Sequence, residues 1–321
     1  MNVTYMSSLQ TALPLDSKKE NAAASAAAPL LQVRDLSVRF GSKEVVRGVS
    51  LDIAAGEKLA LVGESGSGKT ITALSLMRLV PDARTTGQAL LRGRDLQTLS
   101  EREMRGVRGD DIAMIFQEPM TALNPLMTVG QQISEVLQLK KALTPAQSAL
   151  AAIELLAKTG ISEPERRANA FPHQLSGGQR QRAMISMALA SAPALLLADE
   201  PTTALDVTLR GQILELLADL QRSSGMAVLL ITHDLNLVRR FADRVAVMEQ
   251  GVLVEQGRVQ DIFHAPQHPY TQRLMASQPR RDVVEVAPAA GTVPVVVTRE
   301  LRVAYPTPLP GVRGWFKKGE F

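Results

Sequence analysis

The chain has 321 residues, of which 45% are hydrophobic and 21% are charged, and it contains no cysteine. These values predict a folded chain of one large or two medium domains, and they exclude disulfides, thiolate zinc sites and iron–sulfur clusters. No apolar run approaches the roughly 18 residues of a membrane helix. The net charge of +4 is spread along the chain without basic runs, so we expect no nucleic-acid partner.

Short apolar segments predict an open α/β sheet between residues 30 and 280. The segment 30–40 alternates apolar and polar residues, which is typical of a half-exposed strand. Continuous apolar runs, typical of parallel strands covered on both faces, occur at 58–62, 194–198 and 227–231. Helical patterns follow these strands at 70–80 and 208–221. In a sheet built this way, ligands bind at the carboxyl ends of the strands.

Three segments depart from this alternation. Residues 119–190 show apolar residues at helical spacing and no strand pattern, which predicts a helical subdomain inserted in the sheet domain. Residues 1–29 are expected to form a flexible leader. Residues 281–296 are rich in Ala, Val and Pro, so we expect a linker there.

The C-terminal segment repeats the start of the domain. Residues 298–305, TRELRVAY, pair with residues 33–40, VRDLSVRF, at five of eight positions as identical or alike. The match predicts that residues 297–321 begin a second domain of the same kind, truncated; a tail without fixed structure is the alternative. A lone first strand has no sheet to join, so we expect the end of the chain to be mobile or to pair with another molecule.

The segment GESGSGKT at 63–70 follows an apolar strand and precedes a helix, which is the context of a phosphate-binding P-loop. Its backbone N–H groups are expected to bind the phosphates of ATP, Lys69 to reach the β- and γ-oxygens, and the Thr70 hydroxyl to bind Mg²⁺. The predicted nucleotide-binding residues of this loop are Gly63, Glu64, Ser65, Gly66, Ser67, Gly68, Lys69 and Thr70.

Polar residues at the ends of three other apolar strands complete this predicted site. Asp199 is expected to hold Mg²⁺, and Glu200 to accept a proton from the attacking water. His233 ends the next strand, within reach of the γ-phosphate, and Gln117 is placed to contact Mg²⁺ or water. Without the other motifs, the Asp-Glu pair would be interpreted as a helix cap or solvated turn, and Gln117 as a surface residue.

A second glycine loop begins a helix at Ser176, Gly177, Gly178 and Gln179, where free N–H groups favour an anion. Phe40 ends the first strand and is interpreted either as a stacking partner for adenine or as a core residue. The other histidines, His173, His264 and His268, are assigned structural roles because they form no metal-ligand pattern.

The P-loop, Gln117, LSGGQ at 175–179, LLLADEP, TALD and ITHD occur in the order that resembles ATP-binding subunits of ABC transporters, over about residues 30–280. The resemblance implies an α/β P-loop NTPase fold of the ABC type, with a mostly parallel core sheet, an antiparallel β edge and the inserted helical subdomain. It also implies that the Ser176 loop binds the γ-phosphate held by a partner domain in a head-to-tail dimer, with Asp206 near the interface.

A narrower resemblance, to the ATP subunits of dipeptide, oligopeptide, glutathione and nickel importers, comes from FQEPMTALNP, ADEPTTALDV and HPYT. It implies a peripheral protein on the cytoplasmic face of the inner membrane. That protein docks on a permease through the groove around Gln117 and the helical insert, and an external solute-binding protein supplies the solute. Many single-domain members carry a cysteine-rich cluster, which this chain lacks, so the branch with two fused domains is favoured. The alternatives are a soluble ABC ATPase acting on ribosomes or nucleic acid, and an inactive partial chain.

Overall fold

The computed structural model describes residues 28–118, 122–203, 205–277, 296–302, 306–308 and 318–320. The chain divides into two compact units, Met1–Gln278 and Pro279–Phe321. The predicted leader, apart from residues 28 and 29, and nearly all of the predicted linker lie outside the described residues.

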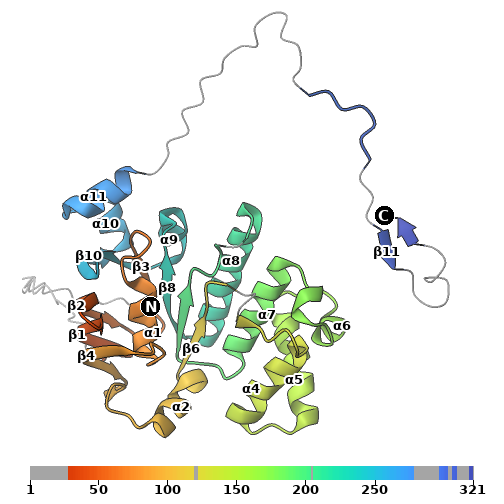
Figure 1. The fold of residues 1–321 in the computed structure, drawn as a ribbon, viewed down its shortest axis with the longest axis horizontal. Coiled ribbons are helices and arrows are strands. Elements are labelled where there is room, and N and C mark those ends of the chain that lie inside the picture. The colour runs from red at the N-terminus through yellow and green to blue at the C-terminus, as the bar shows by residue number, and fades with distance from the viewer. Residues whose placement is uncertain are drawn as a thin grey trace, which may run out of the picture. The chain divides into compact units, whose positions relative to one another are not determined.

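The first unit is built on a six-stranded sheet with the strand order β10-β9-β3-β8-β7-β6 (Figure 1). Neighbouring strands are parallel except for the β9–β10 pair. Four strands are apolar runs whose residues are nearly all buried, because helices or a second sheet cover both faces of the sheet. The strands are β3 Lys58–Val62, β6 Ile112–Ile115, β7 Leu195–Asp199, β8 Ala227–Thr232, β9 Arg244–Glu249 and β10 Val252–Arg258.

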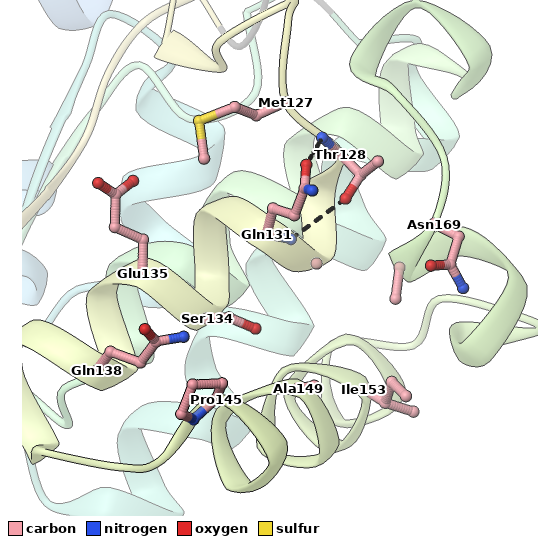
Figure 2. A pocket seen from close by; sticks show the side chains of 12 residues that line it. Met127, Thr128, Gln131, Ser134, Glu135, Gln138, Pro145, Ala149, Ile153 and Asn169 are labelled. Atoms are coloured by element: carbon pink, nitrogen blue, oxygen red, sulfur yellow. Dashed lines mark hydrogen bonds between the residues drawn. The ribbon is translucent and has the colours of Figure 1, made fainter.

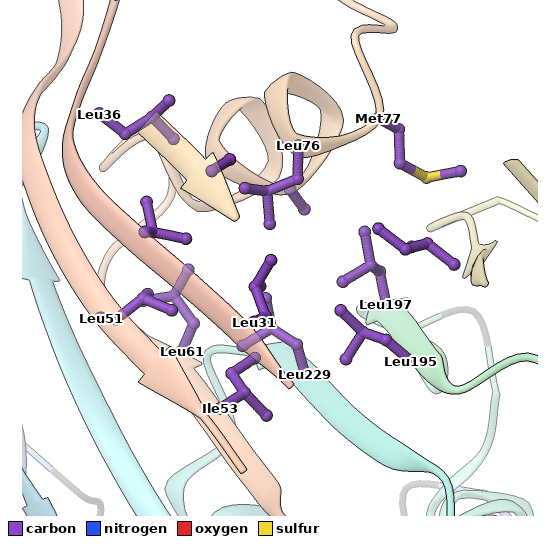
Figure 3. Packing of buried hydrophobic residues seen from close by; sticks show 14 of the residues in the cluster. Leu31, Leu36, Leu51, Ile53, Leu61, Leu76, Met77, Leu195, Leu197 and Leu229 are labelled. Carbon is purple, nitrogen blue, oxygen red and sulfur yellow. The ribbon is translucent and has the colours of Figure 1, made fainter. Parts of the chain in front are cut away.

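A second, antiparallel sheet has the order β2-β1-β4-β5 and lies at one side of the unit (Figure 1). Its strands are β1 Leu31–Phe40, β2 Lys43–Ile53, β4 Ala83–Leu91 and β5 Arg94–Asp95. The alternation in β1 is observed, since Leu31, Val33, Leu36 and Val38 are buried and the residues between them are not. Figure 3 shows Leu31 and Leu36 packed in one core with Leu61, Leu76 and Leu197.

Helices connect the strands of the first unit. They are α1 Lys69–Leu76, α2 Glu101–Asp110, α8 Val207–Ser224, α9 Leu235–Phe241, α10 Val259–His264 and α11 Pro269–Ala276. Helix α8 packs against β7 and β8 through Ile213, Leu217 and Leu220. Helix α1 is shorter than the periodicity predicts, because the chain leaves helical geometry at Arg78, where φ is 53°.

A group of helices fills the described part of residues 122–190, where no strand occurs. It comprises α4 Val129–Lys141, α5 Pro145–Lys158, α6 Pro164–Ala168, η1 Pro172–Gln174 and α7 Gly177–Leu189. Val129, Ile133, Leu156 and Ala183 belong to a core of its own, and in Figure 1 the group lies on the side of the unit away from the antiparallel sheet. The predicted fold class is therefore confirmed, while the exact domain limits stay predictions.

The second unit contains one described pair of strands. β11 Pro306–Pro308 pairs antiparallel with β12 Lys318–Glu320. Of the segment that repeats the start of the domain, residues 303–305 lie outside the described residues, and residues 298–302 are in no strand. These residues make no backbone pairs that would stabilise an extended strand. A second domain beginning here stays a prediction.

Candidate functional site

The P-loop runs from the end of β3 into α1, and two of its glycines are required by close backbone contacts. A Cβ on Gly63 would lie 2.1 Å from the carbonyl oxygen of Met248 in β9. Gly68, at φ 99°, caps α1, and a Cβ there would lie 3.0 Å from the Val45 carbonyl oxygen. Only glycine fits such contacts, so the loop packs directly against the backbones of β9 in one sheet and β2 in the other.

The Lys69 ammonium is held inside the loop. Its Nζ donates to the carbonyl oxygens of Gly63 at 2.9 Å and Glu64 at 2.8 Å, and to the Ser67 hydroxyl at 3.3 Å. The residue is 6% exposed. Burial lowers the pKa of Lys69, and the negative charges of Glu200, Asp199 and Glu64 oppose that effect. The same positive charge is available to a phosphate in the loop.

Thr70 and Asp199 are brought together although 129 residues separate them in the sequence. The Thr70 hydroxyl donates to Asp199 Oδ1 at 3.1 Å, and Asp199 is 2% exposed. Burial raises the pKa of Asp199, and the nearby charge of Glu200 raises it further, while the hydrogen bond from Thr70 and the charge of Lys69 act in the opposite direction. A buried carboxylate in this setting gains from a cation beside it.

The donor set fits Mg²⁺. A hydroxyl and a carboxylate supply hard oxygen ligands, which Mg²⁺ prefers, and Mg²⁺ usually completes its shell with water and substrate phosphate. Among the described residues no group of three or more His, Asp and Glu side chains is arranged to hold a metal ion by itself. Thr70 and Asp199 would therefore share the ion with the nucleotide.

Glu200 and His233 form a pair at the ends of β7 and β8. Glu200 Oε1 lies 2.9 Å from His233 Nδ1, and its Oε2 accepts a hydrogen bond from the Thr203 hydroxyl at 2.5 Å. Burial raises the pKa of Glu200, but the hydrogen bonds of Thr203 and His233 and the charges of His233 and Lys69 outweigh it, so the net pKa is lowered. The carboxylate is thus ionised and held in one orientation.

Gln117 lines the same pocket as the P-loop and Glu200. It is exposed and follows β6, two residues after the strand ends. The open pocket has a volume of about 180 Å³ and is lined by Val45, Ser65, Gly66, Gly68, Lys69, Thr70, Ile71, Gln117 and Glu200. The structure therefore brings together the predicted lysine, hydroxyl, amide and carboxylate.

The second glycine loop lies outside this pocket. Ser176 is the N-cap of α7, where its hydroxyl accepts from the Gln179 N–H at 3.3 Å and the Gln179 side chain accepts from the Ser176 N–H at 3.1 Å. Asp206 caps the start of α8, where its carboxylate accepts from the Leu209 N–H at 2.9 Å. A Cβ on Gly178 would lie 3.1 Å from Leu209 Cδ1. The two helix starts are therefore neighbours, and neither contributes to the pocket of its own P-loop.

Phe40 is partly buried and packs against the core of the antiparallel sheet. This contact agrees with the core interpretation, and stacking on adenine stays a prediction. The remaining histidines have local contacts: His173 stacks on Phe171, His264 Nδ1 lies 2.9 Å from the Gln260 carbonyl oxygen, and His268 caps α11.

A larger pocket of about 500 Å³ lies among α4, α5 and α6 (Figure 2). Gln131 and Thr128, at the start of α4, form a reciprocal capping pair along its edge, and Glu135 and Gln138 follow on the same helix. Leu126, next to this pocket in sequence, is 85% exposed. The pocket and Leu126 lie in the helical region, apart from the P-loop.

Sequence reasoning missed two side chains that contact this site. Thr203 donates to Glu200, and the Tyr270 hydroxyl accepts a hydrogen bond from the Glu64 N–H at 3.0 Å. Thr203 stands beside the Asp-Glu pair in the sequence and was available as a candidate. Tyr270 belongs to HPYT, which was recognised as a family feature, but no pattern in the sequence links it to the P-loop.

The fold and site define an ATP-binding cassette, and comparisons with known proteins agree. A model of the ABC transporter family matches residues 46–203, and a model of the C-terminal region of oligopeptide/dipeptide transporters matches residues 254–299. The solved structure of the ATP-binding cassette MJ0796, a dimer bound to ADP and Pi, is 30% identical with a TM-score of 0.64. The similarity covers 71% of this chain and 98% of that one.

Among curated proteins, the peptidoglycan transport ATP-binding protein YejF of Agrobacterium fabrum is 57% identical over 259 residues, which are 78% of this chain and 47% of YejF. The dipeptide transport ATP-binding protein DppD of Bacillus subtilis is 50% identical over 274 residues, which are 83% of this chain and 82% of DppD. The chain thus spans about half the length of YejF. It belongs to the ABC transporter family, within the oligopeptide/dipeptide group, as predicted.

Proposed function

We propose that the chain binds and hydrolyses ATP and that this reaction powers the import of peptides or similar small solutes through a membrane permease. The observation that carries the proposal is the meeting of Lys69, Thr70, Asp199, Glu200 and His233 at the carboxyl ends of β3, β7 and β8. The peptide-transport relatives support the solute class.

In this site the P-loop N–H groups and the Lys69 ammonium bind the β- and γ-phosphates. Thr70 and Asp199 hold Mg²⁺, which supplies positive charge to the phosphates when bound. Glu200 orients a water molecule and takes one of its protons as the water oxygen bonds to the γ-phosphorus. The bond from that phosphorus to the β–γ bridging oxygen breaks, leaving ADP and phosphate. His233 keeps the Glu200 carboxylate in place.

The hydrolytic site is completed by a second ATP-binding domain. Ser176 and the glycines after it are outside the pocket of the P-loop in the same chain. The N–H groups of Gly177 and Gly178 begin helix α7 and have no acceptor within the helix, so they are available to a nucleotide held elsewhere. The second domain is another copy of this chain or a domain of a different chain, and its γ-phosphate is clamped between Lys69 of one domain and Ser176 of the other. ADP lacks that phosphate, so hydrolysis weakens the interface.

We further propose that the chain is peripheral to the cytoplasmic face of the inner membrane. None of the helices in the described ranges has the length and apolar composition needed to cross a bilayer. The exposed side chains of Phe116, beside Gln117, and of Leu126 offer apolar contacts to a cytoplasmic segment of the permease. Solute selection falls to the permease and an external binding protein.

Uptake measurements test this function. In cells that lack the chain, ATP-dependent uptake of a labelled dipeptide should be restored by the wild-type chain and not by the variant Glu200→Gln. The variant Glu57→Gln, which neutralises a carboxylate paired with Arg244 at 2.8 Å and outside the site, should restore uptake as the wild type does. ATP hydrolysis by the purified chain without any restored uptake of dipeptide, oligopeptide or glutathione would contradict the import role and leave the ATPase standing.

A further inference from the structure

The hydroxyl of Tyr270 contacts the P-loop from a helix more than two hundred residues later in the chain. Its Oη accepts a hydrogen bond from the Glu64 N–H at 3.0 Å. The Glu64 N–H belongs to the peptide group that joins Gly63 and Glu64. The carbonyl oxygen of that same peptide group accepts from Lys69 Nζ at 2.9 Å. Both polar ends of one peptide group are therefore bound, one by Tyr270 and the other by Lys69.

The surroundings of Tyr270 hold it rigidly. The residue is 3% exposed. It packs in a cluster with Ala60 and Val62, the residues of β3 that lead into the P-loop, and with Val245 and Val247 of β9. The tyrosine ring is thus fixed against the strand whose continuation it contacts.

Hydrogen bonds at the start of α11 fix the position of Tyr270 relative to the sheet. The Glu255 carboxylate, on β10, accepts from the N–H groups of Gln267 at 2.8 Å and His268 at 3.1 Å. His268 Nδ1 in turn accepts from the Tyr270 N–H at 3.2 Å. These bonds tie the HPYT segment to the sheet, so the position of the hydroxyl follows from the fold and not from a flexible tail.

The P-loop has a second attachment to the C-terminal part of the domain. The Gly251 N–H donates to the Ser67 carbonyl oxygen at 2.9 Å. This bond joins two backbone groups, so a substitution at Tyr270 removes neither its donor nor its acceptor. The tyrosine hydroxyl is the side-chain attachment at the opposite end of the loop, so its effect can be isolated by substitution.

We propose that Tyr270 is a positioning residue: it fixes the plane of the Gly63–Glu64 peptide group and thereby the place of the Lys69 ammonium in the loop. A rotated peptide would carry its carbonyl oxygen, and the ammonium bonded to it, away from the phosphates. The inference rests on the proposed ATPase function. It gives the C-terminal HPYT segment a part in nucleotide binding.

The test compares Tyr270→Phe with the wild-type chain and with Thr271→Val. Tyr270→Phe keeps the buried ring and removes the acceptor of the Glu64 N–H. Thr271→Val removes a hydroxyl from the adjacent, fully buried residue, which has no bond to the P-loop. The measurements are the dissociation constant of Mg–ATP, KM and kcat of hydrolysis, amide exchange of Glu64 by NMR, and the melting temperature without nucleotide.

For Tyr270→Phe we expect Mg–ATP binding to weaken by about 3- to 10-fold, the factor for one lost hydrogen bond. KM should rise with it while kcat stays near the wild-type value, since binding of the phosphates is weakened equally before and during the reaction. The Glu64 amide hydrogen should exchange faster in Tyr270→Phe than in the wild-type chain, and at the wild-type rate in Thr271→Val.

Two results would overturn the inference. One is wild-type ATP affinity and wild-type Glu64 exchange in Tyr270→Phe. The other is an equal loss of ATP affinity in both variants, accompanied by an equal fall in melting temperature. That result would mean that the Tyr270 hydroxyl only stabilises the fold. Wild-type chain that fails to bind Mg–ATP would refute the proposed function itself, and this inference with it.

Discussion

Replacement of Glu200 by Gln is expected to stop ATP turnover while leaving the fold intact. In the wild-type chain Thr203 donates to one carboxylate oxygen at 2.5 Å, and His233 Nδ1 lies 2.9 Å from the other. A Gln side chain can accept from the Nδ1–H of His233 with its oxygen and donate to the Thr203 hydroxyl oxygen with its amide. Both contacts survive, so we expect the free energy of unfolding to change by less than about 1 kcal/mol.

The loss of turnover has a different origin. A neutral amide cannot take the proton of the attacking water, and general bases contribute about 10²- to 10⁴-fold to a rate. That range corresponds to about 2.7–5.4 kcal/mol of activation free energy. Lys69 and the N–H groups of the P-loop are unchanged, so the dissociation constant of Mg–ATP should stay close to that of the wild-type chain.

Phosphate release at saturating Mg–ATP measures turnover, and an equilibrium titration of Mg–ATP measures binding. The matched control is Glu57→Gln, which removes a partly buried carboxylate at the other end of β3, where it pairs with Arg244. The control should turn over ATP as the wild type does. Turnover by Glu200→Gln within about tenfold of the wild-type rate would refute the general-base role, because it falls short of what such a base contributes.

Four further predictions follow from the same site. Lys69→Ala should weaken Mg–ATP binding in an equilibrium titration. A mixture of the Lys69→Ala and Ser176→Arg chains should regain hydrolysis, because one of the two sites in their heterodimer keeps both Lys69 and Ser176. No recovery of hydrolysis in proven heterodimers would contradict the shared site. Burial raises the pKa of Asp199 above its ordinary value of 3.8, so the folded chain loses stability as the pH rises through that raised pKa and the carboxyl ionises. Asp199→Asn should therefore raise the melting temperature of the chain without nucleotide. Because the variant lacks the carboxylate that holds Mg²⁺, adding Mg–ATP should no longer raise its melting temperature. The lowered pKa of Glu200 keeps it ionised down to its ordinary value of 4.5, so a rate profile should show no acid loss from this group above that pH. Gly63→Ala should abolish ATP binding, since the added Cβ lies 2.1 Å from a backbone oxygen of Met248 and the loop must move; unaltered affinity would show that the loop yields at little cost.

The local parts of the fold and the site could be predicted from the sequence. The P-loop is one contiguous segment between a strand and a helix, so its residue types and spacing are visible in the sequence, and Lys69 and Thr70 followed directly. The core strands were recognised because strands buried on both faces are continuous apolar runs. The helix α1 was predicted too long because apolar periodicity continues to Val80, while the backbone turns at Arg78.

The pairing of distant side chains was decided by tertiary structure. The sheet places β8 between β3 and β7, an order that no local pattern shows, and this order brings Thr70 to Asp199 and Glu200 to His233. The bond between Tyr270 and Glu64 joins residues 206 positions apart. By itself, the sequence determined which residue types stand at strand ends and helix starts, because those depend on near neighbours along the chain. Which of them touch depends on strand order, register and the packing of α11 on the sheet, and these are set by burial of the whole core.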